Sequence, residues 1–186
     1  MSRFFLSLKH WQLFLLILVL PLLIDSVFMY TEIIDKGPER ESLNFRSNMM
    51  MSGFVMAVML YGWHISIVNG LVPKIKEGVR PKSNKFFLAV LYILVYFVVV
   101  TVFYLFDVKN FAVIIPFHLL AMFCVLYTLW FCAKVKKTAE LQKKVSFMDF
   151  FGEFFLLWFF PIGIWFIQPH LNKLSQTADK NRRLTK

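Results

Sequence analysis

The sequence has few charged residues and only two cysteines, and each shortage excludes a class of protein. Charged residues make up 17% of the 186 positions, whereas 59% are apolar and 23 are phenylalanine. Soluble domains run at roughly 25% charged and 45–50% apolar, so a soluble domain of this size cannot bury so much apolar surface. Cys124 and Cys132 lie eight positions apart in one apolar run, which fits neither a redox motif nor a zinc motif. We interpret them as small buried side chains and expect no disulfide.

Sequence motifs of catalytic and metal sites are also missing. No GxSxG, HExxH, P-loop or paired-carboxylate pattern occurs, and neither His64 nor His118 belongs to a metal-ligand cluster. The two histidines also make poor haem ligands, because counting from the outer ends of their helices separates them by ~10 Å in depth. We therefore expect no metal and no cofactor, and we favour a protein that is not an enzyme.

Long apolar runs are what the chain has in abundance. Four of them approach the ~20 residues that cross a ~30 Å hydrocarbon core, so we expect one membrane domain over residues 1–186. No small-residue cleavage site follows the first run, which we therefore interpret as an uncleaved span, kinked at Pro21. The expected spans lie at about 11–30, 49–70, 86–106 and 111–133.

Basic residues concentrate in the segments that join the apolar runs. In a soluble protein the net charge of +10 would suggest nucleic-acid binding. Near membrane ends, however, Lys and Arg favour the cytoplasmic side. Placing both termini in the cytoplasm puts seventeen of the 21 Lys and Arg on that side. We expect this orientation, the lipid bilayer as a partner, and no nucleic acid.

The aromatic block, residues 147–174, contains ten aromatic residues and admits two interpretations. Asp149 to Ile167 is nineteen residues, about 28 Å as a helix, which just suffices for a fifth span. Alternatively, the chain turns at Pro161 to Gly163 and forms a re-entrant or interfacial helical hairpin, whose second half has an apolar stripe suited to the headgroup region. A fifth span would leave twelve basic residues inside and nine outside, so the charge distribution favours the hairpin.

We therefore predict an all-α integral membrane protein with four transmembrane helices plus a C-terminal aromatic hairpin. Five transmembrane helices are the alternative. A basic, disordered tail is expected at 177–186.

Small residues mark the second span as a helix with two packing faces. Small side chains at every fourth position let helix backbones approach closely, so we place this helix centrally, between neighbours. The expected helix-packing residues are Gly53, Ala57, Gly62, Ser66 and Gly70.

Polar residues at membrane depth are costly and usually mark a function or a partner. Asp25 and His118 have similar expected depths, and a pair between them would orient one histidine tautomer, as a proton relay requires. A structural hydrogen bond between packed helices is the simpler interpretation. The candidates for an internal polar path are Asp25, His64, Asn69 and His118.

The aromatic block has its own polar and turn residues. Ser146 and Asp149 match a capping box, which predicts a helix start. Glu153 lies one turn later, and both acids suit a helix N-terminus, although they could also bind a cation or a basic partner. Gln168 looks like a polar stop where the chain leaves the lipid. The interface candidates are Asp149, Glu153, Trp158, Pro161, Gly163, Trp165 and Gln168.

The last twenty residues of the block, FLLWFFPIGIWFIQPHLNKL, resemble the closing segment of a group of small bacterial inner-membrane proteins of unknown function. His170 departs from that pattern, where we expect Arg. The resemblance implies a multi-pass protein of the bacterial inner membrane and implies nothing about chemistry.

These features favour a non-enzymatic interaction or accessory subunit, which would dock on another membrane protein or on itself through the second span and the aromatic block. A small transporter or channel with an internal polar path is the alternative. A membrane enzyme acting on lipid or quinone is a third possibility.

Overall fold

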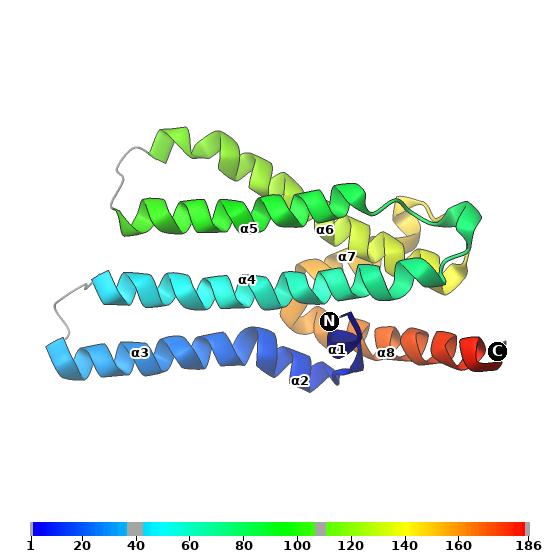
Figure 1. Ribbon diagram of the computed structural model, residues 1–186, viewed down its shortest axis with the longest axis horizontal. Coiled ribbons are helices and arrows are strands. Elements are labelled where there is room, and N and C mark those ends of the chain that lie inside the picture. The colour runs from blue at the N-terminus through cyan, green and yellow to red at the C-terminus, as the bar shows by residue number, and fades with distance from the viewer. Residues whose placement is uncertain (1, 37–42, 107–110, 185–186) are drawn as a thin grey trace.

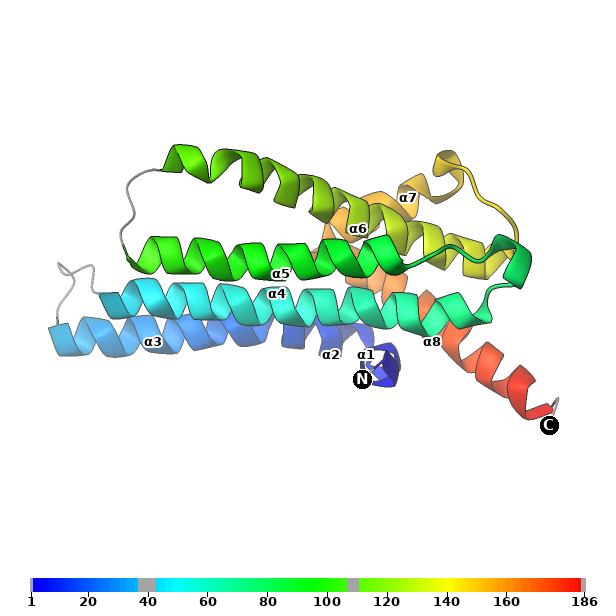
Figure 2. The same cartoon turned by 45° about the horizontal axis from the view of Figure 1, so that its top comes forward.

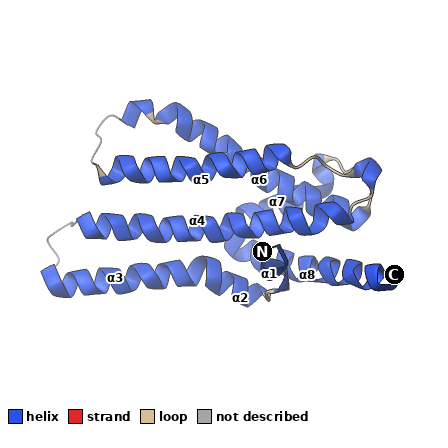
Figure 3. Cartoon of the chain, viewed as in Figure 1, coloured by secondary structure: helices blue, strands red, loops and turns tan. Residues whose placement is uncertain are grey.

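The protein is a bundle of α-helices, and its computed structural model describes residues 2–36, 43–106 and 111–184. Helices are the only regular elements in these ranges (Figure 3). The α-helices are α1 (Ser2–Ser7), α2 (His10–Phe14), α3 (Leu20–Lys36), α4 (Leu43–Leu71), α5 (Asn84–Leu105), α6 (Ile115–Leu141), α7 (Phe147–Trp158) and α8 (Phe160–Leu184). Short 3₁₀ turns lie at Val72–Lys74, Glu77–Val79 and Phe111–Val113.

Four of the helical segments are long and apolar enough to cross a membrane, which confirms the predicted number of spans. They are His10–Thr31, Met49–Lys74, Asn84–Leu105 and Ile115–Leu141. Large apolar side chains point outward from them, such as Leu88 of α5 at 70% exposure and Phe123 of α6 at 69%. Because water would penalise such a surface, we assign it to contact with lipid.

The first span changes direction just before Pro21. Between α2 and α3 the chain forms a π-helical turn, Leu15–Val19, and the ribbon steps sideways there (Figure 1). Proline has no N–H to donate to the carbonyl four residues earlier, here Ile17, and its ring crowds that carbonyl. The wider turn is a usual way to accommodate such a break, so the predicted kink has a local cause.

α4 is the central helix of the bundle and contacts α1, α3, α5, α6 and α8. Its small residues meet large neighbours. A Cβ on Gly53 would lie 3.3 Å from the ring of Phe97 on α5, and one on Gly62 would lie 3.1 Å from the ring of Phe5 on α1. The second packing face thus receives the short N-terminal helix α1, which the sequence did not predict.

The aromatic block forms a helical hairpin and not a fifth span. α7 runs from one end of the bundle toward its middle, and α8 packs against α7 and returns to the same end (Figures 1 and 2). The apolar stripe of α8 faces the bundle, since Ile164, Ile167 and Leu171 are buried in the core. Packing against protein therefore replaces the expected contact of this stripe with lipid headgroups.

Two helices extend beyond the predicted boundaries. The fourth span was expected to end near 133, but α6 continues to Leu141, and its last turns carry Lys136 and Lys137, which pair with Glu153. The tail was expected to be disordered from 177, but the backbone of α8 is helical to Leu184. No proline or glycine follows Pro169 to end that helix.

Candidate functional site

The four polar residues considered for a path through the membrane lie in different surroundings. Asp25 is half-buried on α3, His64 is fully buried in α4, and Asn69 is exposed near the end of α4. His118 is exposed near the start of α6. The structure therefore does not join them into one path.

The hypothesised pair of Asp25 and His118 is wrong, because His118 has a different partner. Its Nδ1 lies 2.8 Å from the hydroxyl of Tyr96 on α5. α3 and α6 run along opposite sides of the bundle at this end, with α4 and α5 between them (Figures 1 and 2). The hydrogen bond thus joins the adjacent helices α5 and α6, although the His118 side chain remains exposed.

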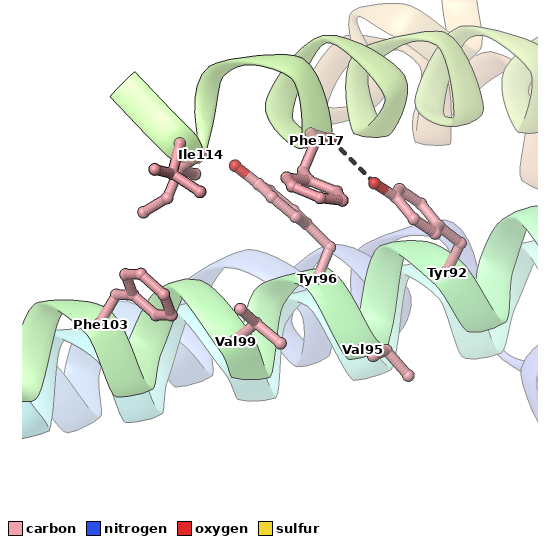
Figure 4. Close-up of a pocket in the computed structure, with 8 residues that line it drawn as sticks. Tyr92, Val95, Tyr96, Val99, Phe103, Ile114 and Phe117 are labelled. Carbon is pink, nitrogen blue, oxygen red and sulfur yellow. Dashed lines mark hydrogen bonds between the residues drawn. The ribbon is translucent and has the colours of Figure 1, made fainter. Parts of the chain in front are cut away.

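An apolar groove of about 250 Å³ lies beside this pair, between α5 and α6. Tyr92 and Tyr96 rise from α5 toward α6, and the Tyr92 hydroxyl donates to the carbonyl of Phe117 at 3.0 Å (Figure 4). Val95 and Val99 of α5 also line the groove. Because the groove is apolar, its walls suit contact with lipid chains. The hydroxyl groups of Tyr92 and Tyr96 contact α6 and thus hold it to α5.

His64 is enclosed by aromatic side chains. Its ring lies 5.6 Å from the ring of Tyr61 and 5.5 Å from that of Trp63. Neither ring nitrogen has a hydrogen-bond partner among the described residues. A buried polar atom without a partner gives up its hydrogen bonds to water and gains none in return. The two ring nitrogens of His64 therefore lower the free energy of unfolding.

Gln168 holds the hairpin to the rest of the bundle. Its Oε1 accepts from the indole N–H of Trp63 on α4 at 3.0 Å. Its Nε2 donates to the carbonyls of Phe5 at 2.8 Å and Leu8 at 3.0 Å, at the end of α1 and just after it. Asn172, one turn later, also donates to the Leu8 carbonyl at 3.1 Å. A residue expected to leave the lipid is thus a fully buried junction of α1, α4 and α8.

A second junction joins α6 to α7 through charged side chains. Glu153 Oε1 lies 3.1 Å from Lys136 Nζ and 3.2 Å from Lys137 Nζ. Glu140 Oε2 lies farther from the same two ammonium groups, at 3.6 and 3.5 Å. Burial alone would raise the pKa of Glu153, but the charge of Lys136 and hydrogen bonds from both lysines hold that pKa below its usual value.

The turn of the hairpin lies slightly before the predicted position. Phe159 is the one non-helical residue between α7 and α8, with φ −88° and ψ 57°, and Pro161 sits in the first turn of α8, where proline is favoured. Gly163 is required by a close approach, because a Cβ at that position would collide with the backbone carbonyl of Leu156. The glycine therefore allows α8 to fold back tightly against α7.

The outer side of α7 carries a row of four exposed aromatic residues, which we call the aromatic ladder: Phe147, Phe151, Phe155 and Trp158. Neighbouring rings are in contact along the row, with centroids 5.4, 4.7 and 6.3 Å apart. A neighbouring side of α7 buries Phe150 and Leu157 in the core, and the ring of Phe147 contacts that of Phe150 at 5.5 Å. The ladder therefore stands on a helix whose rotation is set by buried contacts.

Two further residues of the aromatic block act within the fold. Ser146 donates its backbone N–H and its hydroxyl to Asp149, at 2.7 and 3.2 Å, so the predicted capping box is present. These two hydrogen bonds lower the pKa of the Asp149 carboxyl. Trp165 of α8 packs against His10 of α2, with ring centroids 4.7 Å apart.

Sequence reasoning missed the partners of these residues. Lys136 and Lys137 lie beyond the predicted end of the fourth span at 133, although the spacing of Lys136 and Glu140 by four positions is a signal that a helix continues. Trp63 and Tyr96 had no signal, because an aromatic residue in an apolar helix is indistinguishable from its neighbours until a partner is known.

No family model matches this chain, and no curated protein or solved structure matches it either.

Proposed function

We propose that this protein is a non-enzymatic interaction subunit that docks on a helix of another membrane protein through the aromatic ladder. The observation that supports this most is that the ladder is held in one orientation. Gln168 ties α8 to α1 and α4, Glu153 ties α7 to α6, and Gly163 closes the hairpin. A ladder that is already fixed needs less ordering when a partner binds.

Aromatic side chains suit such a role for energetic reasons. They bury a large area with few rotatable bonds, and aromatic residues are enriched among the residues that dominate binding energy. Contacts between neighbouring rings restrict them before binding, so less conformational entropy is lost on association. The ladder from Phe147 to Trp158 combines both properties.

A photo-crosslinking amino acid at Phe155 tests this proposal in native membranes. We expect one protein adduct of defined mass from Phe155, and only lipid adducts from the same probe at Phe123, an exposed residue of α6 that serves as the matched control. Lipid adducts alone at both positions would rule out a protein partner. An adduct of twice the chain mass would identify a second copy as the partner.

We further propose a location in a bacterial inner membrane, with both termini in the cytoplasm. The resemblance of residues 155–174 supports the membrane, and the distribution of Lys and Arg supports the orientation. The hairpin agrees with it, because α8 returns to the end of the bundle at which α7 starts. A reporter enzyme fused after Lys186 should be active if it works only in the cytoplasm. Alkaline phosphatase, which is active only in the periplasm, should be inactive at the same position, and its activity would contradict this orientation.

A further inference from the structure

A pocket of about 390 Å³ with both charged and apolar walls lies between α6, α7 and α8. Its charged and polar walls are Lys136, Lys137, Glu140, Glu153 and His170, and its apolar walls are Leu156, Phe166 and Ile167. Gly152 completes the lining, and a Cβ there would have no atom within 4 Å. From these features, we propose that the pocket binds the headgroup of a zwitterionic phospholipid that has a primary amine, such as phosphatidylethanolamine.

The two lysines supply donors for a phosphate. Each ammonium group has three N–H donors, and each makes one short contact, to the same oxygen of Glu153. That shared carboxylate holds the two ammonium groups next to each other, and the longer distances to Glu140 leave donors available. Paired cationic donors of this kind make charge-assisted hydrogen bonds to phosphate oxygens.

Glu140 and His170 supply acceptors for an ammonium group. Glu140 is the more loosely held carboxylate of the cluster, at 3.5 and 3.6 Å from the lysines. His170 Nδ1 lies 2.8 Å from the carbonyl of Phe166, and since a carbonyl can only accept, Nδ1 carries the hydrogen. In the tautomer that carries its single hydrogen on Nδ1, Nε2 is an acceptor. Donors and acceptors thus match a phosphate and an amine on one ligand.

The depth of the pocket also suits a lipid headgroup. Lys136 lies five residues before the end of α6 and Glu153 six residues after the start of α7. Both are therefore roughly 8–9 Å from the end of the bundle, at 1.5 Å per residue. The headgroup layer is about 5–8 Å thick, so this depth corresponds to its boundary with the hydrocarbon core.

An apolar path leads from the pocket toward the tip of the hairpin. Phe166 and Ile162 lie one turn apart on α8, and both are largely exposed. They continue the side of the helix that bears His170, in the direction of the membrane interior. Acyl chains of a lipid whose headgroup fills the pocket would lie along this surface.

The test uses the full chain, delipidated in detergent and titrated with dilauroylphosphatidylethanolamine or dilauroylphosphatidylglycerol in native mass spectrometry. We expect the amine lipid to bind at least about tenfold more tightly, the gain of about one charge-assisted hydrogen bond. Equal binding of the two lipids would overturn the proposal. So would displacement of the lipid by inorganic phosphate alone, because the pocket would then be a site for a soluble anion.

Two variants separate the pocket from general effects on folding. Gly152→Leu should project into the pocket, since its Cβ meets no atom within 4 Å, and weaken binding of the amine lipid about tenfold or more. Gly78→Leu, at an open glycine in the loop after α4, should leave that binding unchanged. Glu140→Gln should remove the preference for the amine lipid while the phosphatidylglycerol affinity is kept. Unchanged binding in Gly152→Leu, or an unchanged preference in Glu140→Gln, would refute the assignment.

Discussion

Replacing Gln168 by leucine should destabilise the whole bundle, because it removes the junction of three helices. Leucine fills a similar volume but leaves the indole N–H of Trp63 and the carbonyl of Phe5 without the partners that Gln168 gives them. The carbonyl of Leu8 still accepts from Asn172. An unsatisfied buried polar group costs about 1–3 kcal/mol, so two of them predict a loss of roughly 2–6 kcal/mol.

The free energy of unfolding in detergent micelles, followed by tryptophan fluorescence during titration with dodecyl sulfate, measures this loss. Asn69→Leu replaces an exposed amide of α4 and should stay within about 0.5 kcal/mol of the wild type. Combining Gln168→Leu with Trp63→Phe should cost less than the sum of the single changes, because the second change removes a donor already orphaned by the first. A loss below about 1 kcal/mol in Gln168→Leu, or full additivity with Trp63→Phe, would refute this account of the junction.

Three further predictions concern the hairpin and the core. Gly163→Ala should destabilise the protein by more than 1 kcal/mol, since its Cβ collides with the Leu156 carbonyl, whereas Gly152→Ala should be neutral; equal melting temperatures would contradict the close approach. His64→Leu should raise the melting temperature, with a gain on the order of 1 kcal/mol, because it removes two unpaired buried nitrogens, and a marked fall would show that the imidazole has a partner. The pKa of Glu153 is lower in the folded state than in the unfolded chain. The ionised carboxylate therefore stabilises the fold above the ordinary pKa of about 4.3, and this stabilisation is lost as pH falls through the folded-state pKa. The difference in melting temperature between wild type and Glu153→Gln should therefore shrink in acid, and a constant difference from pH 7 to 3 would exclude this ion pair as its source.

The sequence alone determined the elements whose causes are local. Four apolar runs predict four spans because lipid cannot satisfy backbone polar groups and each run must therefore form a helix of sufficient length. Ser146 and Asp149 predict a helix start for a similar reason, since their hydrogen bonds stay within one turn. The charge distribution also favoured the hairpin over a fifth span.

Which polar residue meets which partner depends on how the helices are arranged in the folded bundle. Gln168 and Trp63 are 105 positions apart, and nothing in either segment specifies the other. His118 was paired with the wrong helix, and Lys136 was placed in a loop although it is buried against Glu153. The physical reason is that hydropathy sets whether a helix forms and crosses, whereas side-chain pairing depends on how each helix is rotated and tilted against its neighbours. The rotation of each helix depends on packing over the whole bundle. It cannot be predicted from one apolar run, because apolar residues occupy every side of such a helix.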